Sequence, residues 1–297
     1  MSARHKKHFL KFLFLLTISL SLTAWSPSTV DHYYDLYQAV KPVPLLTQSE
    51  PGFSYEDAYT FQEKFALRFE QAGDELVGYK VGLTGVQRPF GATEPLYGRL
   101  FNSMLRENND HIYLSDFVRA MVEIEIAFIF AKDVAYPVTL EKLQASVDKV
   151  APAVELPDLL FADMQKLSWF DLIAVDVAPR RVIIGKGMNL DEVGDVNTIT
   201  AVAKHEGQIV SQGAATNVMG NQWAALLFLV EKLNSRGYQV KKGDIVITGA
   251  MNTMFPAARG TYEVDYGKLG MIKFKVIEKQ VSIDINPGSF RKALSGR

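Results

Sequence analysis

The sequence predicts an α+β fold in which helices come first and β-strands follow. Between residues 28 and 75, Ala58, Phe61, Phe65 and Phe69 recur at the three- and four-residue spacing of an amphipathic helix. From residue 76 onward, short runs rich in Val, Ile and Phe alternate with turn-forming Gly, Pro and Asn, which is the pattern of strands. At 297 residues with near-average composition, the chain is long enough for one substantial globular domain.

Two helices are expected in the N-terminal region. Ser54 is a suitable N-cap because Glu56 and Asp57 follow it in the first turn, and Gly73 ends the helical pattern. A shorter helix over residues 33–40 ends before a Lys-Pro pair, since the residue before a proline avoids helical geometry. We assign packing or subunit contact, rather than chemistry, to this region.

The first residues have the organisation of a secretory signal peptide. Basic residues occupy the start of the chain, an apolar run extends from Phe9 to Leu22, and a small-residue exit follows around Ala24. The alternative is a transmembrane anchor, but about 14 apolar residues fall short of the roughly 20 that a spanning helix needs. We therefore expect residues 1–25 to be cleaved, no stable membrane anchor to remain, and the mature protein to be secreted into the periplasm.

Composition excludes several classes of function. The chain has no cysteine, so it forms no disulfide and carries no lipid on a cysteine. Its formal net charge of -1 becomes more negative once the basic first residues are removed, so we expect no nucleic-acid partner. After the signal peptide only His32, His111 and His205 remain, too scattered for a histidine-rich metal site. P-loop and GxGxxG fingerprints are absent from the sequence.

The rest of the chain shows further elements by the same patterns. Residues 139–150 have helical periodicity, with Leu143, Val147 and Val150 on one side. The other expected elements are a strand at 182–185, a helix from Gln222 to Leu233 capped by Asn221, a strand at 245–248, a hairpin over 261–276, and a polar tail at 281–297.

The segment 121–130 is a strand-forming run that carries two carboxylates two positions apart. Alternation along a strand places Glu123 and Glu125 on one face and the apolar residues between them on the other. Two like charges on a buried or half-buried face cost several kcal/mol unless a cation or hydrogen bonds compensate them. Either this is an edge strand with a wet face, or a divalent metal lies between the acids. Glu155, in another apolar run, is a candidate third acid.

Lys80 lies on a predicted strand whose neighbours on the same face are small. Gly78, Gly82 and Thr84 share its side of the strand, and glycines in strands often mark a close approach of ligand or backbone. The alternatives are an ordinary edge charge and a lysine in a pocket, and the small neighbours favour the pocket. Residues 85–101 form a long loop that is suited to be a rim or lid.

Three more residues are candidates for contact with a substrate. Thr84 shares the face of Lys80. Thr248 and Gly249 end a strand, where a hydroxyl and backbone amides are expected to be exposed. We assign substrate binding to these three residues.

Five motifs occur in one order along the chain. The motifs are Gly-Tyr-Lys-Val-Gly-Leu-Thr at 78–84, Val-Glu-Ile-Glu-Ile-Ala-Phe at 122–128, Pro-Ala-Val-Glu at 152–155, Asn-Val-Met-Gly at 217–220, and Gly-Asp-Ile-Val-Ile-Thr-Gly-Ala at 243–250. Together they resemble the 2-keto-4-pentenoate hydratase and 4-oxalocrotonate decarboxylase branch of the fumarylacetoacetate hydrolase superfamily, over about residues 30–280.

The resemblance implies a fold, a metal and a site. The fold is a mixed β-roll over residues 76–280, the catalytic and metal-binding part, after the helical region 28–75. The metal is divalent, usually magnesium or manganese, and the substrates are small 2-oxo or 2-hydroxydienoic acids. By position, Glu123, Glu125 and Glu155 match the metal ligands of the family and Lys80 matches its pocket lysine.

These residue types suit that chemistry. Three carboxylates without imidazole form a hard, all-oxygen site that favours Mg²⁺ or Mn²⁺ over zinc or copper. A 2-oxo acid can bind such a metal through its carboxylate and keto oxygens, and the metal then stabilises an enolate as a Lewis acid. Two roles are open to Lys80: proton transfer, or pairing with the substrate carboxylate. If Lys80 transfers the proton, we expect its removal to change the metal affinity very little.

The sequence departs from the family pattern at two places. Where these hydratases typically have Ile-Ala-Asp-Asn-Ala-Ser, the chain has Ile-Ala-Val-Asp-Val-Ala at 173–178, so that Val175 replaces an acid. After Gly220, the common His-Pro or Asn-Pro is replaced by Asn221-Gln222. Both departures bear on the substrate more than on the metal or the fold.

The sequence as a whole predicts a secreted, homo-oligomeric lyase. We expect it to add water to a 2-hydroxy-2,4-dienoate, the enol form of a 2-oxo-enoate, and to give a 4-hydroxy-2-oxo acid. The alternatives are a 2-oxo-3-enedioate decarboxylase, an acylpyruvate-type C–C hydrolase with His205 or His111 as its base, and a noncatalytic 2-oxo-acid binding protein.

Overall fold

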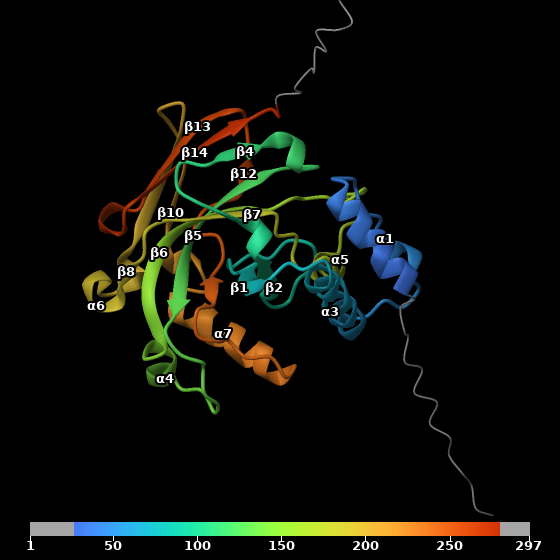
Figure 1. The fold of residues 1–297 in the computed structure, drawn as a ribbon, viewed down its shortest axis with the longest axis horizontal. Coiled ribbons are helices and arrows are strands. Elements are labelled where there is room, and N and C mark those ends of the chain that lie inside the picture. The colour runs from blue at the N-terminus through green and yellow to red at the C-terminus, as the bar shows by residue number, and fades with distance from the viewer. Residues whose placement is uncertain (1–26, 280–297) are drawn as a thin grey trace, which may run out of the picture.

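The computed structural model describes residues 27–279, which fold into two β-sheets with one group of helices at one end and the others along the sheets (Figure 1). The predicted signal peptide, residues 1–25, and the predicted tail, residues 281–297, lie outside the described residues. In the described part, none of the helices combines the length and the apolar character needed to cross a membrane.

The larger sheet has β5 at its centre. Its strands run in the order β2-β1-β11-β5-β6-β7-β3, with β12 also paired to β5 and β8 to β6. β5 is antiparallel to both β11 and β6, whereas β1 is parallel to β11, so the sheet is mixed. The strands are β1 (Leu76–Gly82), β2 (Leu96–Phe101), β3 (Leu105–Arg106), β5 (Met121–Phe130), β6 (Val147–Leu156), β7 (Arg181–Ile184), β8 (Met188–Asn189), β11 (Ile245–Ile247) and β12 (Phe255–Pro256).

The smaller sheet packs across the first. Its order is β10-β9-β13-β14-β4, and β13 and β14 form the hairpin predicted over 261–276. Tyr266, at the turn of that hairpin, donates its hydroxyl to the carbonyl of Ala153 on β6 and so joins the two sheets. The strands are β4 (His111–Tyr113), β9 (Thr200–His205), β10 (Gln208–Ala214), β13 (Gly260–Asp265) and β14 (Met271–Ile277).

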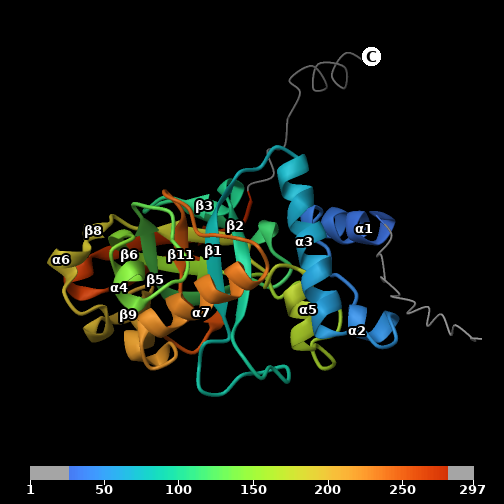
Figure 2. The ribbon, with the colours of Figure 1, turned by 90° about the horizontal axis from the view of Figure 1, so that it is seen from below.

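Helices α1, α2, α3 and α5 lie together at one end of the molecule, and α7 runs along the larger sheet beside β1 (Figures 1 and 2). The predicted cap of α3 is confirmed, because Ser54 accepts from the amide of Asp57 while Asp57 accepts from the amide of Ser54. Asn221 likewise caps α7. The helices are α1 (Pro27–Gln38), α2 (Leu46–Ser49), α3 (Tyr55–Gln71), α4 (Leu140–Gln144), α5 (Trp169–Ala174), α6 (Leu190–Val193) and α7 (Gln222–Ser235).

The prediction of a helix over residues 139–150 is wrong in its second half. Only α4 is helical, and Val147 and Val150 lie on β6, where Val150 pairs with Phe128 of β5. Pairing with β5 and the strand preference of β-branched residues prevail over the helical spacing. Helix α5 and strands β9 and β10 were not foreseen from the sequence.

The two faces of β5 are as its alternating pattern predicts. Ile124, Ile126 and Phe128 are fully buried in the main core, which extends to the helices. Ala127, on the other face, belongs to a smaller apolar cluster with residues of β2, β6, β7 and β11. The α+β class and the β-roll expected from the resemblance are therefore both observed, and the glutamates lie on the face of the smaller cluster.

Candidate active site

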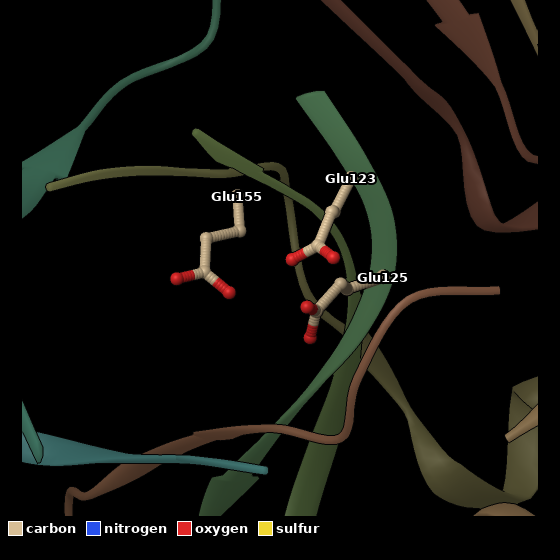
Figure 3. A group of neighbouring side chains, drawn as sticks. All are labelled: Glu123, Glu125 and Glu155. Atoms are coloured by element: carbon tan, nitrogen blue, oxygen red, sulfur yellow. The ribbon is translucent and has the colours of Figure 1, made fainter. Parts of the chain in front are cut away.

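The three glutamates meet where β5 and β6 pair. Glu123 is directly opposite Glu155 in the register, and Glu125 follows two positions later on the same face. One carboxylate oxygen from each residue lies within 4.8 Å of the others. Figure 3 shows the three carboxylates pointing toward one another from adjacent strands. The wet-edge alternative is excluded for this strand, since β5 is central and Glu125 and Glu155 are fully buried.

Burial and mutual repulsion perturb the acids strongly. Burial, with the nearby charge of Glu155, raises the pKa of Glu123 from 4.5 to about 7. The same causes, with the charge of Glu123 added, raise the pKa of Glu125 well above its usual value. Glu125 Oε1 and Glu155 Oε2 are buried without a hydrogen-bond partner. Buried oxygens that lack donors and converge on one point fit a hard divalent cation.

The backbone at Gly249 fixes Glu125. Its amide donates to Glu125 Oε2 over 2.8 Å, while the other oxygen of that carboxylate stays free. The residue has φ of +106°, and a Cβ there would come 2.3 Å from the Thr84 hydroxyl. Only glycine tolerates this conformation in this space. Gly249 thus orients a candidate metal ligand, and its structure-based role is separate from the substrate contact predicted for it.

Lys80 reaches the same cluster from β1. Its buried ammonium forms a short salt bridge with Glu155 and donates to the carbonyl of Val177 over 3.1 Å. Burial by itself lowers the pKa of Lys80, but the attraction of the three carboxylates outweighs burial and the pKa is raised. Lys80 therefore has partners on one side, Glu155 and the Val177 carbonyl, and it also lines a cavity, as the small neighbours on its strand suggested.

A left-handed turn delivers the Val177 carbonyl to Lys80. Asp176, Val177 and Ala178 have φ of 60°, 60° and 54° in succession. Left-handed geometry costs about 1 kcal/mol or more for each residue with a Cβ, so tertiary contacts must hold this turn. One of these contacts needs Gly98 on β2, because a Cβ there would lie 2.2 Å from the carbonyl oxygen of Asp176.

A buried ion pair supports this turn. Asp176 is 1% exposed, and its Oδ1 lies 3.7 Å from Arg99 Nη1, a contact too long for a hydrogen bond. Burial raises the pKa of Asp176 to about 6, although the guanidinium opposes the rise. Arg99 also donates to Gln62 of α3 and lies over the ring of Tyr238. Sequence reasoning missed this pair; the only signal was an aspartate beside the replaced family acid at Val175.

A cavity of about 560 Å³ opens beside the glutamates. Lys80, Glu123 and Thr84 line it, so the predicted pocket lysine and one metal ligand face the same space as one predicted substrate contact. The substrate role of Thr84 remains a prediction. Neither His111 nor His205 belongs to the lining, and His205 stacks on Tyr262 in the smaller sheet.

The expectation that Thr248 exposes its hydroxyl is wrong. Thr248 is fully buried, and its hydroxyl donates to the side chain of Gln222 at the start of α7. Gln222 in turn donates to the carbonyl of Ala215. The hydroxyl is turned away because α7 packs over the end of β11, a long-range contact that the local pattern does not reveal.

Comparison with known proteins shows which family the chain belongs to. A 2-oxo-hept-4-ene-1,7-dioate hydratase of Escherichia coli is 30% identical over 237 residues, which are 76% of this chain and 88% of the relative. The chain belongs to the hydratase and decarboxylase branch of the fumarylacetoacetate hydrolase superfamily. A 2-keto-4-pentenoate hydratase of Paraburkholderia xenovorans, 28% identical over 254 residues, covers 84% of this chain and 94% of its own. No family model matches the chain.

The solved structures agree with this branch assignment. A 4-oxalocrotonate decarboxylase of Pseudomonas putida, complexed with magnesium and adipate, superimposes with a TM-score of 0.80 at 26% identity. The match covers 84% of this chain and 97% of the decarboxylase. As a member of the branch, the protein is a lyase of the hydratase type.

The stability of the metal-free protein should fall as pH rises. Carboxylates whose pKa is raised in the folded state bind more protons folded than unfolded between pH 4.5 and about 7, so ionisation there favours unfolding. Thermal unfolding in chelator should therefore show a lower Tm at about pH 8 than at about pH 5.5. Mg²⁺ or Mn²⁺ at about 100 times Kd should raise Tm by roughly 5 to 10 °C at the higher pH.

Two variants separate the effects of pH and metal on Tm from a general effect of removing a negative charge. Glu125→Gln should remove most of the metal-dependent gain and raise the metal-free Tm at high pH, because it deletes one of the repelling charges. Glu192→Gln, at an exposed position on α6, should change neither. A wild-type Tm that ignores both ions would rule out a metal at this cluster.

The turn at 176–178 gives a second test with a matched pair of glycines. Gly98→Ala should displace the Asp176 carbonyl and, through Val177, the ammonium of Lys80, lowering kcat by about 10-fold or more. The metal-dependent gain in Tm should fall less than in Glu125→Gln, because all three carboxylates remain. Gly85→Ala should be mild, since its Cβ would meet only the Gln87 carbonyl at 3.6 Å. Equal kcat values for the two variants would contradict the role given to the turn.

Proposed function

We propose that the protein hydrates a small 2-hydroxy-2,4-dienoate to a 4-hydroxy-2-oxo acid. The observation that carries this proposal is the meeting of Glu123, Glu125, Glu155 and Lys80 at one cavity. In the net reaction one water adds across the diene: its hydroxyl bonds to carbon 4 and a proton to carbon 5. The enol proton moves to carbon 3 and leaves a ketone, so no oxidant or reductant is needed.

The metal of this site is proposed to be Mg²⁺ or Mn²⁺. The donors are all carboxylate oxygens, which these hard cations prefer. Glu123, Glu125 and Glu155 would hold the cation, and the Gly249 amide keeps the Glu125 carboxylate in position. When bound, the metal supplies Lewis-acid stabilisation of negative charge on the oxygens of a 2-oxo acid.

Lys80 is the residue of the chain suited to proton transfer here. The carboxylates of the metal-free site raise the pKa of Lys80, and its ammonium, which faces the cavity, can serve as an acid or as a cation for the substrate carboxylate. The carbonyl of Val177 and the carboxylate of Glu155 fix the direction of the ammonium. Lys80 is 2% exposed, and the low local dielectric of a buried position strengthens its electrostatic effect.

The rival reactions make different demands on the site. Decarboxylation of a 2-oxo-3-enedioate needs the same stabilised enolate but no attacking water. Hydrolytic C–C cleavage of an acylpyruvate needs a base for water, and the described lining of the cavity offers no histidine for that role. A noncatalytic binding protein would keep the metal and the cavity without turnover. Hydration is favoured because hydratases are prominent among the named relatives.

Product analysis with Mg²⁺-loaded protein tests the proposal. Loss of dienoate absorbance should accompany formation of 4-hydroxy-2-oxo acid without release of carbon dioxide. Lys80→Ala should lower kcat by about 100-fold or more. It should also change metal affinity, because the salt bridge to Glu155 couples the lysine to a ligand; the sequence-based expectation of barely altered affinity did not include this contact. Lys275→Ala, an exposed strand lysine, is the control.

Two results would overturn the proposal in different ways. Release of carbon dioxide from an oxo-enedioate, with no hydration of dienoates, would assign the protein to the decarboxylases. Metal-dependent binding of oxalate with no turnover of dienoate, oxo-enedioate or acylpyruvate would leave a binding protein.

Export and self-association complete the proposal. The basic and apolar start of the chain supports secretion to the periplasm, and protein purified from that fraction should begin near residues 24–30. An intact Met1 on that protein would contradict cleavage.

Ile209 and Val210, 64% and 42% exposed on the edge strand β10, support a homo-oligomer. Ile209→Lys should then lower the molecular mass in light scattering, and a monomeric wild type would refute association.

A further inference from the structure

The cavity beside the glutamates has charge at one end only. Among its described lining residues, Lys80 and Glu123 are the only ionisable ones, and both belong to the candidate metal site. Lys80 is already paired with Glu155. The lining therefore supplies one charged end, where a 2-oxo acid group would bind, and no second cation.

The rest of the cavity is mainly apolar and comes from four separate segments. Leu83 and Phe90 belong to the loop after β1, Leu159 follows β6, Leu172 is on α5, and Met254 follows β11. Among the contacts that hold that loop, the amide of Trp169 donates to the Phe90 carbonyl over 3.0 Å, and Arg88 Nε donates to the Leu83 carbonyl over 2.9 Å. The apolar wall is therefore built into the fold.

The volume of the cavity bears on the size of the substrate. At about 560 Å³ it is within the range for drug-sized ligands, far larger than a five-carbon acid requires. Each methylene added to a substrate that fills apolar space gains affinity severalfold, because it leaves water. A second carboxylate placed in the same space loses its hydration without gaining a cation, and its cost is much larger than that gain.

We propose that the substrate carries a single carboxylate and an apolar tail beyond carbon 5. The inference rests on the proposed hydratase function and names the class of acid that this chain prefers. Dicarboxylic acids, which occur in the names of the heptenedioate hydratase and of the adipate complex, are then disfavoured by this cavity. The balance of the reaction is unchanged, since the tail on carbon 5 takes no part in bond formation.

Arg88 is the residue that would serve a dicarboxylate if this inference were wrong. It lies between the lining residues Gln87 and Pro89, but its own side chain is outside the lining and bonded to Leu83. A second carboxylate would have to draw the guanidinium away from that carbonyl. The variant Arg88→Gln therefore distinguishes the two classes of substrate.

Binding of two nonreacting acids with the same carbon chain tests the proposal. 2-Oxohexanoate and 2-oxoadipate differ only in a terminal methyl or carboxylate, and their Kd values would be measured by calorimetry on Mg²⁺-loaded protein. We expect 2-oxohexanoate to bind about 100-fold more tightly, and affinity to rise from 2-oxobutanoate to 2-oxooctanoate. Arg88→Gln should leave this preference in place. Equal or tighter binding of 2-oxoadipate, especially if lost in Arg88→Gln, would overturn the inference.

Turnover gives an independent readout and separates the two proposals. kcat/KM should increase from 2-hydroxy-2,4-pentadienoate to its hepta- and octadienoate homologues, and should be about 100-fold lower for the heptadienedioate than for the heptadienoate. Phe90→Ala should reduce kcat/KM for the octadienoate more than for the pentadienoate, whereas Thr93→Ala, at an exposed position of the same loop outside the lining, should reduce neither. If the protein hydrates pentadienoate but neither tail length nor a second carboxylate changes kcat/KM, the proposed apolar tail is refuted and the hydratase function stands. Absence of hydration for every dienoate refutes the proposed function.

Discussion

The repulsion among three carboxylates on two paired strands, two of them fully buried and the third half-buried, is the constraint on which the site depends. The register of β5 and β6 places Glu155 opposite Glu123, and the strand period adds Glu125 to the same face. The ammonium of Lys80 balances one charge, leaving acids whose pKa values are raised and oxygens that have no donor. A divalent cation would satisfy all three carboxylates together, and its binding would then stabilise the fold.

The backbone around the site is arranged to serve these charges. The Gly249 amide holds Glu125, and the Val177 carbonyl holds Lys80, so main-chain groups orient both signs of charge. The left-handed turn that presents Val177 is strained. The Arg99–Asp176 pair and the close packing of the Asp176 carbonyl against Gly98 keep it in place. Strained backbone of this kind is found at functional sites, where it positions a reactive group.

Much of this organisation could be predicted from the sequence. The period-two pattern of β5 gave the common face of Glu123 and Glu125, and the Ser54 capping signal gave the start of α3. The order of the motifs indicated Glu155 and Lys80, which the structure brings together. Local patterns could not reveal the turn at 176–178, since Val and Ala favour right-handed or extended geometry. They also could not show that α7 covers Thr248 or that Arg99 is buried, because both depend on long-range packing.

The most direct test of the account is the position of a bound metal. Crystals grown with Mn²⁺ and oxalate would be measured at the manganese absorption edge, so that the anomalous signal identifies the ion. We expect a single strong peak enclosed by Glu123, Glu125 and Glu155, with oxalate on the side of the cavity that Lys80 lines. A peak elsewhere, or three glutamates with no metal between them at saturating Mn²⁺, would contradict it.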